Sequence, residues 1–214
     1  MKTILKLLGV LVVLAVLGLL FMLSGCYDVA ASTPDNGLVE WVLRTTQARS
    51  VHRGYEGLEG KVQVPKLDDP QLIQTGLVHY HEMCATCHGA PGVKISEIGQ
   101  GLNPTPPELA SQGGDEPLET FWIVKNGIKM TGMPSFGVTH SDDEIWAIVA
   151  FVDRMPKLTP QEYQSLVKQA GLGQAGEEPG ETSGEAQPSG EHHEEAAGQH
   201  HHHTHPPGTP PHKD

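Results

Sequence analysis

Two cysteines and a histidine in the middle of the chain have types and a spacing that could do chemistry. Cys84 and Cys87 are separated by two residues, and His88 follows directly. Two thiols one helical turn apart can each add across one vinyl group of a porphyrin, and the adjacent imidazole can then bind the iron. The motif therefore predicts one covalently bound c-type haem, with Cys84 and Cys87 as attachment points and His88 as proximal axial ligand.

Two other kinds of site use a C-x-x-C pair. A redox pair usually follows the strand–helix–strand pattern of a thioredoxin-like fold, and no such pattern surrounds these cysteines. A structural zinc site needs two more Cys or His ligands at suitable spacing, and the chain has no second C-x-x-C. The third cysteine, Cys26, lies far from the motif, so haem attachment is the favoured interpretation.

The segments that must position this motif are expected to be helical. A helical stretch over 72–84 leads into the motif, and a Gly- and Pro-rich loop over 89–114 follows it. A short helix over 118–126 should end at Gly127 in a left-handed cap. Two later helices begin with capping boxes, Ser141 with Glu144 and Thr159 with Glu162. Because no segment alternates apolar and polar residues for long, the sequence predicts an all-α domain.

Taken together, three segments resemble class I monohaem cytochromes c of the membrane-anchored bacterial type. The segments are Gly76-x-x-x-Tyr80-x-x-x-Cys84-x-x-Cys87-His88-Gly89, then Gly132-Met133-Pro134 followed by Phe136, then residues 141–153. The resemblance covers roughly residues 70–155. It implies the class I cytochrome c fold, in which helices and long loops wrap around one covalent haem. It also implies that Gly76 and Tyr80 meet Ile148 and Phe151, where the first and last helices of the fold cross.

The same resemblance implies two further roles at the haem. Met133 would be the distal axial ligand, and Met/His ligation raises the reduction potential relative to bis-histidine ligation. A proline carbonyl would accept a hydrogen bond from the proximal histidine; Pro106 is favoured among three prolines in the loop, Pro104, Pro106 and Pro107. Four other side chains remain as rivals for the distal position, namely Met130, His79, His81 and His140. Met130 is expected in the core, and His79 and His81 are expected to be exposed.

The N-terminal segment reads as an export signal or membrane anchor. Lys2 and Lys6 precede a run of 17 uncharged residues, 7–23, which can just cross a bilayer. The positive end stays in the cytoplasm, so the haem domain is expected in the periplasm, anchored to the bacterial cytoplasmic membrane. Leu23-Ser24-Gly25-Cys26 also resembles a lipobox, so lipidation of Cys26 after cleavage is the alternative to an uncut transmembrane helix.

The predicted organisation has four parts. Residues 1–26 are the signal or anchor, 27–69 a juxtamembrane helix and linker, 70–172 the cytochrome c domain, and 173–214 a disordered His-rich tail. A helix over 35–57 should be capped by Asn36. In the tail, a cluster of histidines could bind a divalent metal through neutral imidazoles: His200, His201, His202, His203 and His205.

Composition narrows the class of function. The formal net charge of -12 argues against nucleic-acid binding. An iron held by His88 and Met133 has no open position for a substrate, so no small-molecule substrate and no enzymatic activity are expected. The sequence predicts a single-electron carrier whose partners are redox proteins of the membrane or periplasm. The alternatives are the haem subunit of a membrane dehydrogenase or oxidase complex, and a haem-based sensor in which Met133 is labile.

Overall fold

A computed structural model of the chain describes residues 1–173. The predicted His-rich tail, with His200, His201, His202, His203 and His205, lies outside the described residues. Within residues 1–173 the ordered elements are helices, and the only bridge pairing joins Ala90 to Val93 in a turn. The all-α prediction is confirmed.

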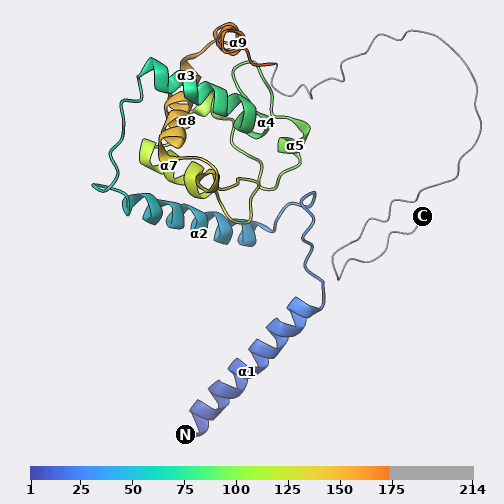
Figure 1. Ribbon diagram of the computed structural model, residues 1–214. Helices are drawn as coiled ribbons and strands as arrows, with labels where there is room; N and C mark the ends of the chain where they lie inside the picture. Colours follow the sequence, from blue (N-terminus) through green and yellow to red (C-terminus); the bar gives the residue numbers. More distant parts are fainter. Residues whose placement is uncertain (174–214) are drawn as a thin grey trace, which may run out of the picture. The chain divides into compact units, whose positions relative to one another are not determined.

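The elements follow one another along the chain in this order (Figure 1). They are α1 (Lys2–Leu23), α2 (Gly37–Glu56), α3 (Pro70–His79), the π-helical turn η1 (Tyr80–Cys84), α4 (Ala85–His88), α5 (Glu97–Gln100), α6 (Leu109–Gln112), α7 (Pro117–Asn126), the 3-10 turn η2 (Phe136–Val138), α8 (Asp142–Arg154), the 3-10 turn η3 (Met155–Lys157) and α9 (Pro160–Gln169). By length and composition, α1 is the one helix among them that could cross a membrane.

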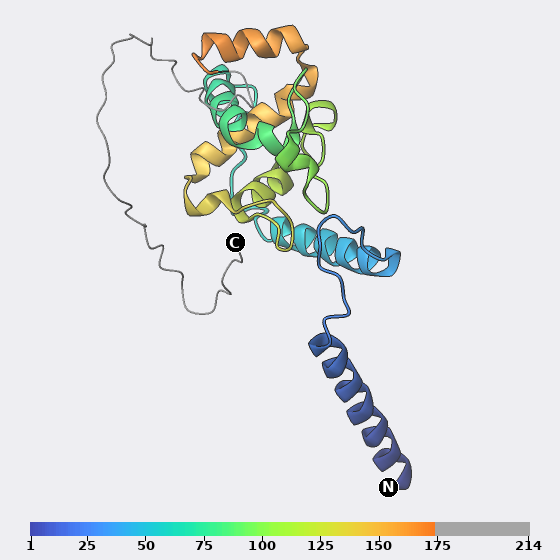
Figure 2. The same ribbon diagram turned by 90° about the vertical axis from the view of Figure 1, so that its right-hand side faces the viewer.

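The core forms where α3 crosses α8 (Figures 1 and 2). Gly76 makes the close approach, because a Cβ there would overlap the backbone carbonyl of Ala147 and lie 2.9 Å from the Cβ of Phe151. The Tyr80 and Phe151 rings pack one turn further on, with centroids 5.3 Å apart. The expected crossing of Gly76 and Tyr80 with Phe151 is thus present, and the atoms nearest to the glycine belong to Ala147.

Both predicted capping boxes are present. Ser141 and Glu144 bond reciprocally at the start of α8, and Thr159 and Glu162 do so at the start of α9. The pKa of Glu162 is lowered because the backbone N–H and the hydroxyl of Thr159 both donate to its carboxylate, at 2.7 and 2.8 Å. Because the folded-state pKa of Glu162 is lowered, its ionised carboxylate stabilises the fold near neutral pH. This stabilisation is lost as the pH falls through the folded-state pKa of Glu162.

We expect Thr159→Ala to destabilise the protein by about 1 kcal/mol, because the cap of α9 loses the side-chain oxygen that accepts the Glu162 N–H. Denaturant unfolding at neutral pH measures this loss. The difference between parent and variant should shrink as the solution is acidified, since protonated Glu162 no longer supports the cap. Thr45→Ala, on the exposed part of α2, serves as the control and should be close to neutral.

The segment before the cytochrome-like region also folds as predicted, and it is not a free spacer. Asn36 caps α2 by accepting the Leu38 N–H, and the helix ends at Glu56. Further along, α2 packs on α7, where Gly54 lies against the indole of Trp122. Trp122 is half-buried, and part of its surface faces α2. Trp146 is buried and stacks on Phe121 at 4.3 Å, as expected of a core residue.

Candidate haem site

The cysteine motif lies at the end of one continuous helical segment. α3 passes into the π turn η1 at Tyr80, and the chain returns to α-helical geometry in α4, so that Cys84 ends the π turn. The buried Tyr80 hydroxyl donates to the Gly89 carbonyl at 2.6 Å, which ties the turn before the motif to the chain after it. Single π turns inside α-helices are often found at functional sites. The turn was not predicted from the sequence.

The two thiols differ in exposure. Cys84 is buried, which raises the pKa of its thiol to about 12, whereas Cys87 is half-buried. A redox C-x-x-C pair depends on a lowered thiol pKa, so the environment of Cys84 is the reverse of what that chemistry requires. Within residues 1–173 no three His, Cys, Asp or Glu side chains gather as a metal site, so a structural zinc site also lacks its ligands in that part of the chain.

The imidazole of His88 is held by one carbonyl. Its Nδ1–H donates to the Pro107 oxygen at 3.0 Å, which fixes the ring and leaves Nε2 as the nitrogen that can bind a metal. Burial lowers the pKa of His88 more than this hydrogen bond raises it, so the ring is neutral near pH 7. The Pro106 carbonyl was expected to accept this hydrogen bond, and that prediction is wrong: the acceptor is the next residue, Pro107. Each of the three prolines in the loop has a carbonyl that could accept from His88. The path of the chain into α6 decides which carbonyl faces the ring.

The loop that carries Met133 is closed on itself. The Thr131 hydroxyl donates to the Ile128 carbonyl at 2.8 Å and accepts the Met133 N–H at 3.1 Å, while the Ile128 N–H donates to the Met133 carbonyl at 3.1 Å. Gly127 precedes the loop at φ 64° and ψ -175°, a positive-φ conformation that is extended rather than the expected left-handed helical cap. A Cβ there would lie 2.6 Å from the Pro134 backbone. The glycine therefore lets the loop return beside the end of α7.

The rival distal ligands are placed elsewhere. Met130 was expected in the core, but it is 81% exposed and stands at φ 60°, whereas Met133 packs against the core. His81 was expected to be exposed, but it is buried and uses both ring nitrogens, at 2.8 Å from the Tyr163 hydroxyl and 2.8 Å from the Gly173 carbonyl. His79 and His140 pack on each other with ring centroids 5.3 Å apart. Met133 is the methionine whose surroundings suit a haem ligand.

The two loops that would enclose a haem meet each other. A Cβ on Gly132, next to Met133, would lie 2.5 Å from Leu102 in the loop that follows His88. The first loop is also tied to the cysteine motif, because the Ser96 N–H donates to the Thr86 carbonyl at 3.0 Å. The donor set of this region, two thiols in one turn, an imidazole oriented by a carbonyl and a thioether in the facing loop, fits a c-type haem.

Comparison with protein families identifies the domain that holds these residues. Residues 71–152, which run from α3 into α8, match the family described as cytochrome c oxidase, cbb3-type, subunit III. These residues form a class I cytochrome c domain. The cytochrome c domain makes the protein an electron-transfer haem protein, and α1 fits a membrane anchor in front of it.

One solved structure resembles part of this chain. A chain in a solved structure of the reducing HAO-like protein complex of Kuenenia stuttgartiensis is similar over 44% of this chain and 49% of that chain, with 24% sequence identity and a TM-score of 0.36. The present chain therefore spans about half the length of the solved chain that it matches. The search of curated proteins found no match.

Proposed function

We propose that the protein carries single electrons through one haem c, attached at Cys84 and Cys87 and ligated by His88 and Met133. The hydrogen bond from His88 to the Pro107 carbonyl is the observation that carries this proposal. It fixes the orientation and tautomer of the imidazole, as is usual for a histidine that binds a metal. When bound, the haem supplies reversible one-electron chemistry at iron. The chain's own residues orient the ligands, bury the attachment helix and fill the axial positions.

The remaining parts of the proposal concern placement. We take residues 70–172 as the cytochrome c domain and α1 as the anchor in the bacterial cytoplasmic membrane, with the haem domain in the periplasm. The positive residues Lys2 and Lys6 at the start of α1 support this orientation. Lipidation at Cys26, which lies exposed just after α1, is the other route to the same tether. The partners are then redox proteins of the membrane or periplasm.

The family match favours a second candidate. Because the matched family is described as a subunit of a cbb3-type oxidase, the protein can serve as the haem subunit of a membrane redox complex instead of an independent carrier. Purification from the native membrane in mild detergent separates the two. A larger catalytic chain that remains in constant ratio through several columns supports the subunit, and a protein that elutes alone supports the carrier.

Haem attachment is tested by substituting the cysteines in a cell that attaches c-type haem. Mass spectrometry of the intact parent should show one porphyrin added to the chain, and the Cys84→Ser/Cys87→Ser double variant should show none, because no thiol remains near the vinyl groups. Cys26→Ser is the matched control, since it removes the third cysteine and should keep its haem. A parent chain without bound porphyrin would refute the proposal. The same spectra report whether Cys26 is lipidated.

A further inference from the structure

The helix α2 has two parts with different surroundings. Its C-terminal part is fixed to the cytochrome c domain: Val51 is buried, and a Cβ on Gly54 would lie 2.5 Å from the indole nitrogen of Trp122 in α7. Only glycine permits that approach, so α2 and α7 meet at a close contact. The family match begins after α2, at residue 71, so this helix is an addition to the cytochrome c domain.

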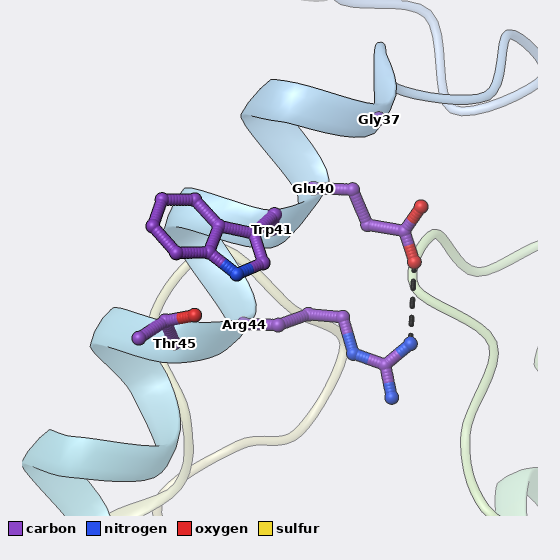
Figure 3. Close-up of a pocket in the computed structure, with 5 residues that line it drawn as sticks. All are labelled: Gly37, Glu40, Trp41, Arg44 and Thr45. Atoms are coloured by element: carbon purple, nitrogen blue, oxygen red, sulfur yellow. Dashed lines mark hydrogen bonds and ion pairs between the residues drawn. The ribbon is translucent and has the colours of Figure 1, made fainter.

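The first two turns of α2 expose large apolar side chains. Leu38 is 68% exposed, Trp41 64% and Val42 45%. At 100° per residue, Leu38 and Val42 lie about 140° and 180° around the helix from Val51, and Trp41 lies about 80° from it. Their exposed fractions show that packing on α7 does not cover them. Figure 3 shows Trp41 on one side of a shallow depression and the ion pair of Arg44 with Glu40, at 3.2 Å, on the other. An exposed apolar cluster of this kind marks a contact surface.

Two observations favour a lipid surface as the partner of this apolar cluster. The cluster begins shortly after the membrane-spanning helix: residues 24–36 join α1 to α2, and a chain of that length reaches at most roughly 45 Å. The chemistry also fits, since a tryptophan among aliphatic residues with arginines close by is typical of a helix in the membrane interface. Arg44, Arg49 and Arg53 lie on this helix in a chain whose net charge is -12.

We propose that Leu38, Trp41 and Val42 insert into the interfacial region of the membrane, so that α2 lies on the bilayer surface. This inference rests on the proposed anchoring by α1. Because the other end of α2 is fixed to α7 through Gly54 and Trp122, the helix sets the orientation of the cytochrome c domain relative to the membrane. The tether then holds the domain in a chosen direction instead of leaving it on a free linker.

The test uses the full-length holoprotein in vesicles of phosphatidylethanolamine and phosphatidylglycerol that contain a small fraction of a phosphatidylcholine with a diazirine on its acyl chain. After illumination, tandem mass spectrometry locates the labelled residues. We expect labelling within residues 37–45 at least about fivefold above that at Ile98 in α5 and Val138 in η2, apolar residues of the domain that are at least as exposed. Labelling within α1 reports anchoring independently.

A triple variant, Leu38→Ser/Trp41→Ser/Val42→Ser, should lose the labelling of α2 and keep that of α1. Ile98→Ser/Val138→Ser is the matched control and should change neither. If α1 is labelled while α2 stays at the level of Ile98 and Val138, the inference is wrong and anchoring stands; that result would point to a protein partner for the cluster. If α1 is not labelled and the mass of the protein shows no lipid on Cys26, the proposed anchoring fails and the inference fails with it. Should the triple variant not bind haem normally, labelling of the parent alone decides.

Discussion

Replacing Met133 with alanine should open the sixth position of the iron and lower the reduction potential by on the order of 0.1 V or more. A thioether is a weak donor that favours the ferrous state, so its loss removes that preference and admits water or another ligand. The reduced variant should then bind carbon monoxide near neutral pH, whereas the parent should resist it. Potentiometric titration and absorption spectra with carbon monoxide measure the two effects.

Met130 offers a matched control for this experiment. It lies three residues before Met133 in the same loop, but it is 81% exposed, whereas Met133 packs against the core. Met130→Ala should therefore keep the potential and the spectra of the parent. Identical spectra of the Met133→Ala protein and the parent would exclude Met133 as a ligand, and a change in the Met130→Ala protein alone would assign the ligand to Met130. Carbon monoxide binding by the parent would favour the sensor that the sequence left open.

Gly76→Val should unfold the cytochrome c domain or destabilise it by more than about 3 kcal/mol. The added Cβ would overlap the Ala147 carbonyl, and that obstacle is backbone, which cannot rotate aside as a side chain can. Relief requires α3 and α8 to separate, and that separation would open the contact between Tyr80 and Phe151. Denaturant unfolding followed by far-ultraviolet circular dichroism, together with the yield of haem-loaded protein, measures the loss.

Substitutions at two other glycines serve as comparisons for Gly76→Val. Gly37, at the start of α2, has no atom within 4 Å of its Cβ position, so Gly37→Val should cost little. The atoms nearest to a Cβ on Gly54 belong to the Trp122 side chain, which can move, so Gly54→Val should loosen α2 from α7 and leave the haem domain folded. A Gly76→Val protein as stable as the Gly37→Val protein would contradict the crossing of α3 and α8 described here.

Local signals predicted the helices well, because each depends on residues close in sequence. Each capping box pairs one hydroxyl side chain, Ser141 or Thr159, with a glutamate three residues later. The cap at Asn36 needs one side chain and a backbone N–H two residues away. Such contacts form almost regardless of the rest of the fold. The attachment motif is local in the same sense, since its chemistry lies within one helical turn.

The remaining features depend on how distant segments meet, and a single sequence contains no signal for that. The burial of His81 depends on Tyr163, 82 residues later, and the contact of Trp122 depends on Gly54 in a helix before the domain. The choice of Pro107 over Pro106 depends on the path of a loop in which three prolines offer equal carbonyls. Met130 was expected inside, but it is exposed in a loop that is bonded through the Thr131 hydroxyl.

The bonds of His81 also show where this domain can safely be cut. The family match stops at residue 152, yet the buried Tyr163 and Val167 complete the core beyond it, and His81 finds its two partners at Tyr163 and Gly173. A fragment that ended at the family boundary would lose both hydrogen-bond partners of His81, which lies three residues before Cys84. The shortest useful fragment of this cytochrome therefore retains α9 and continues through residue 173.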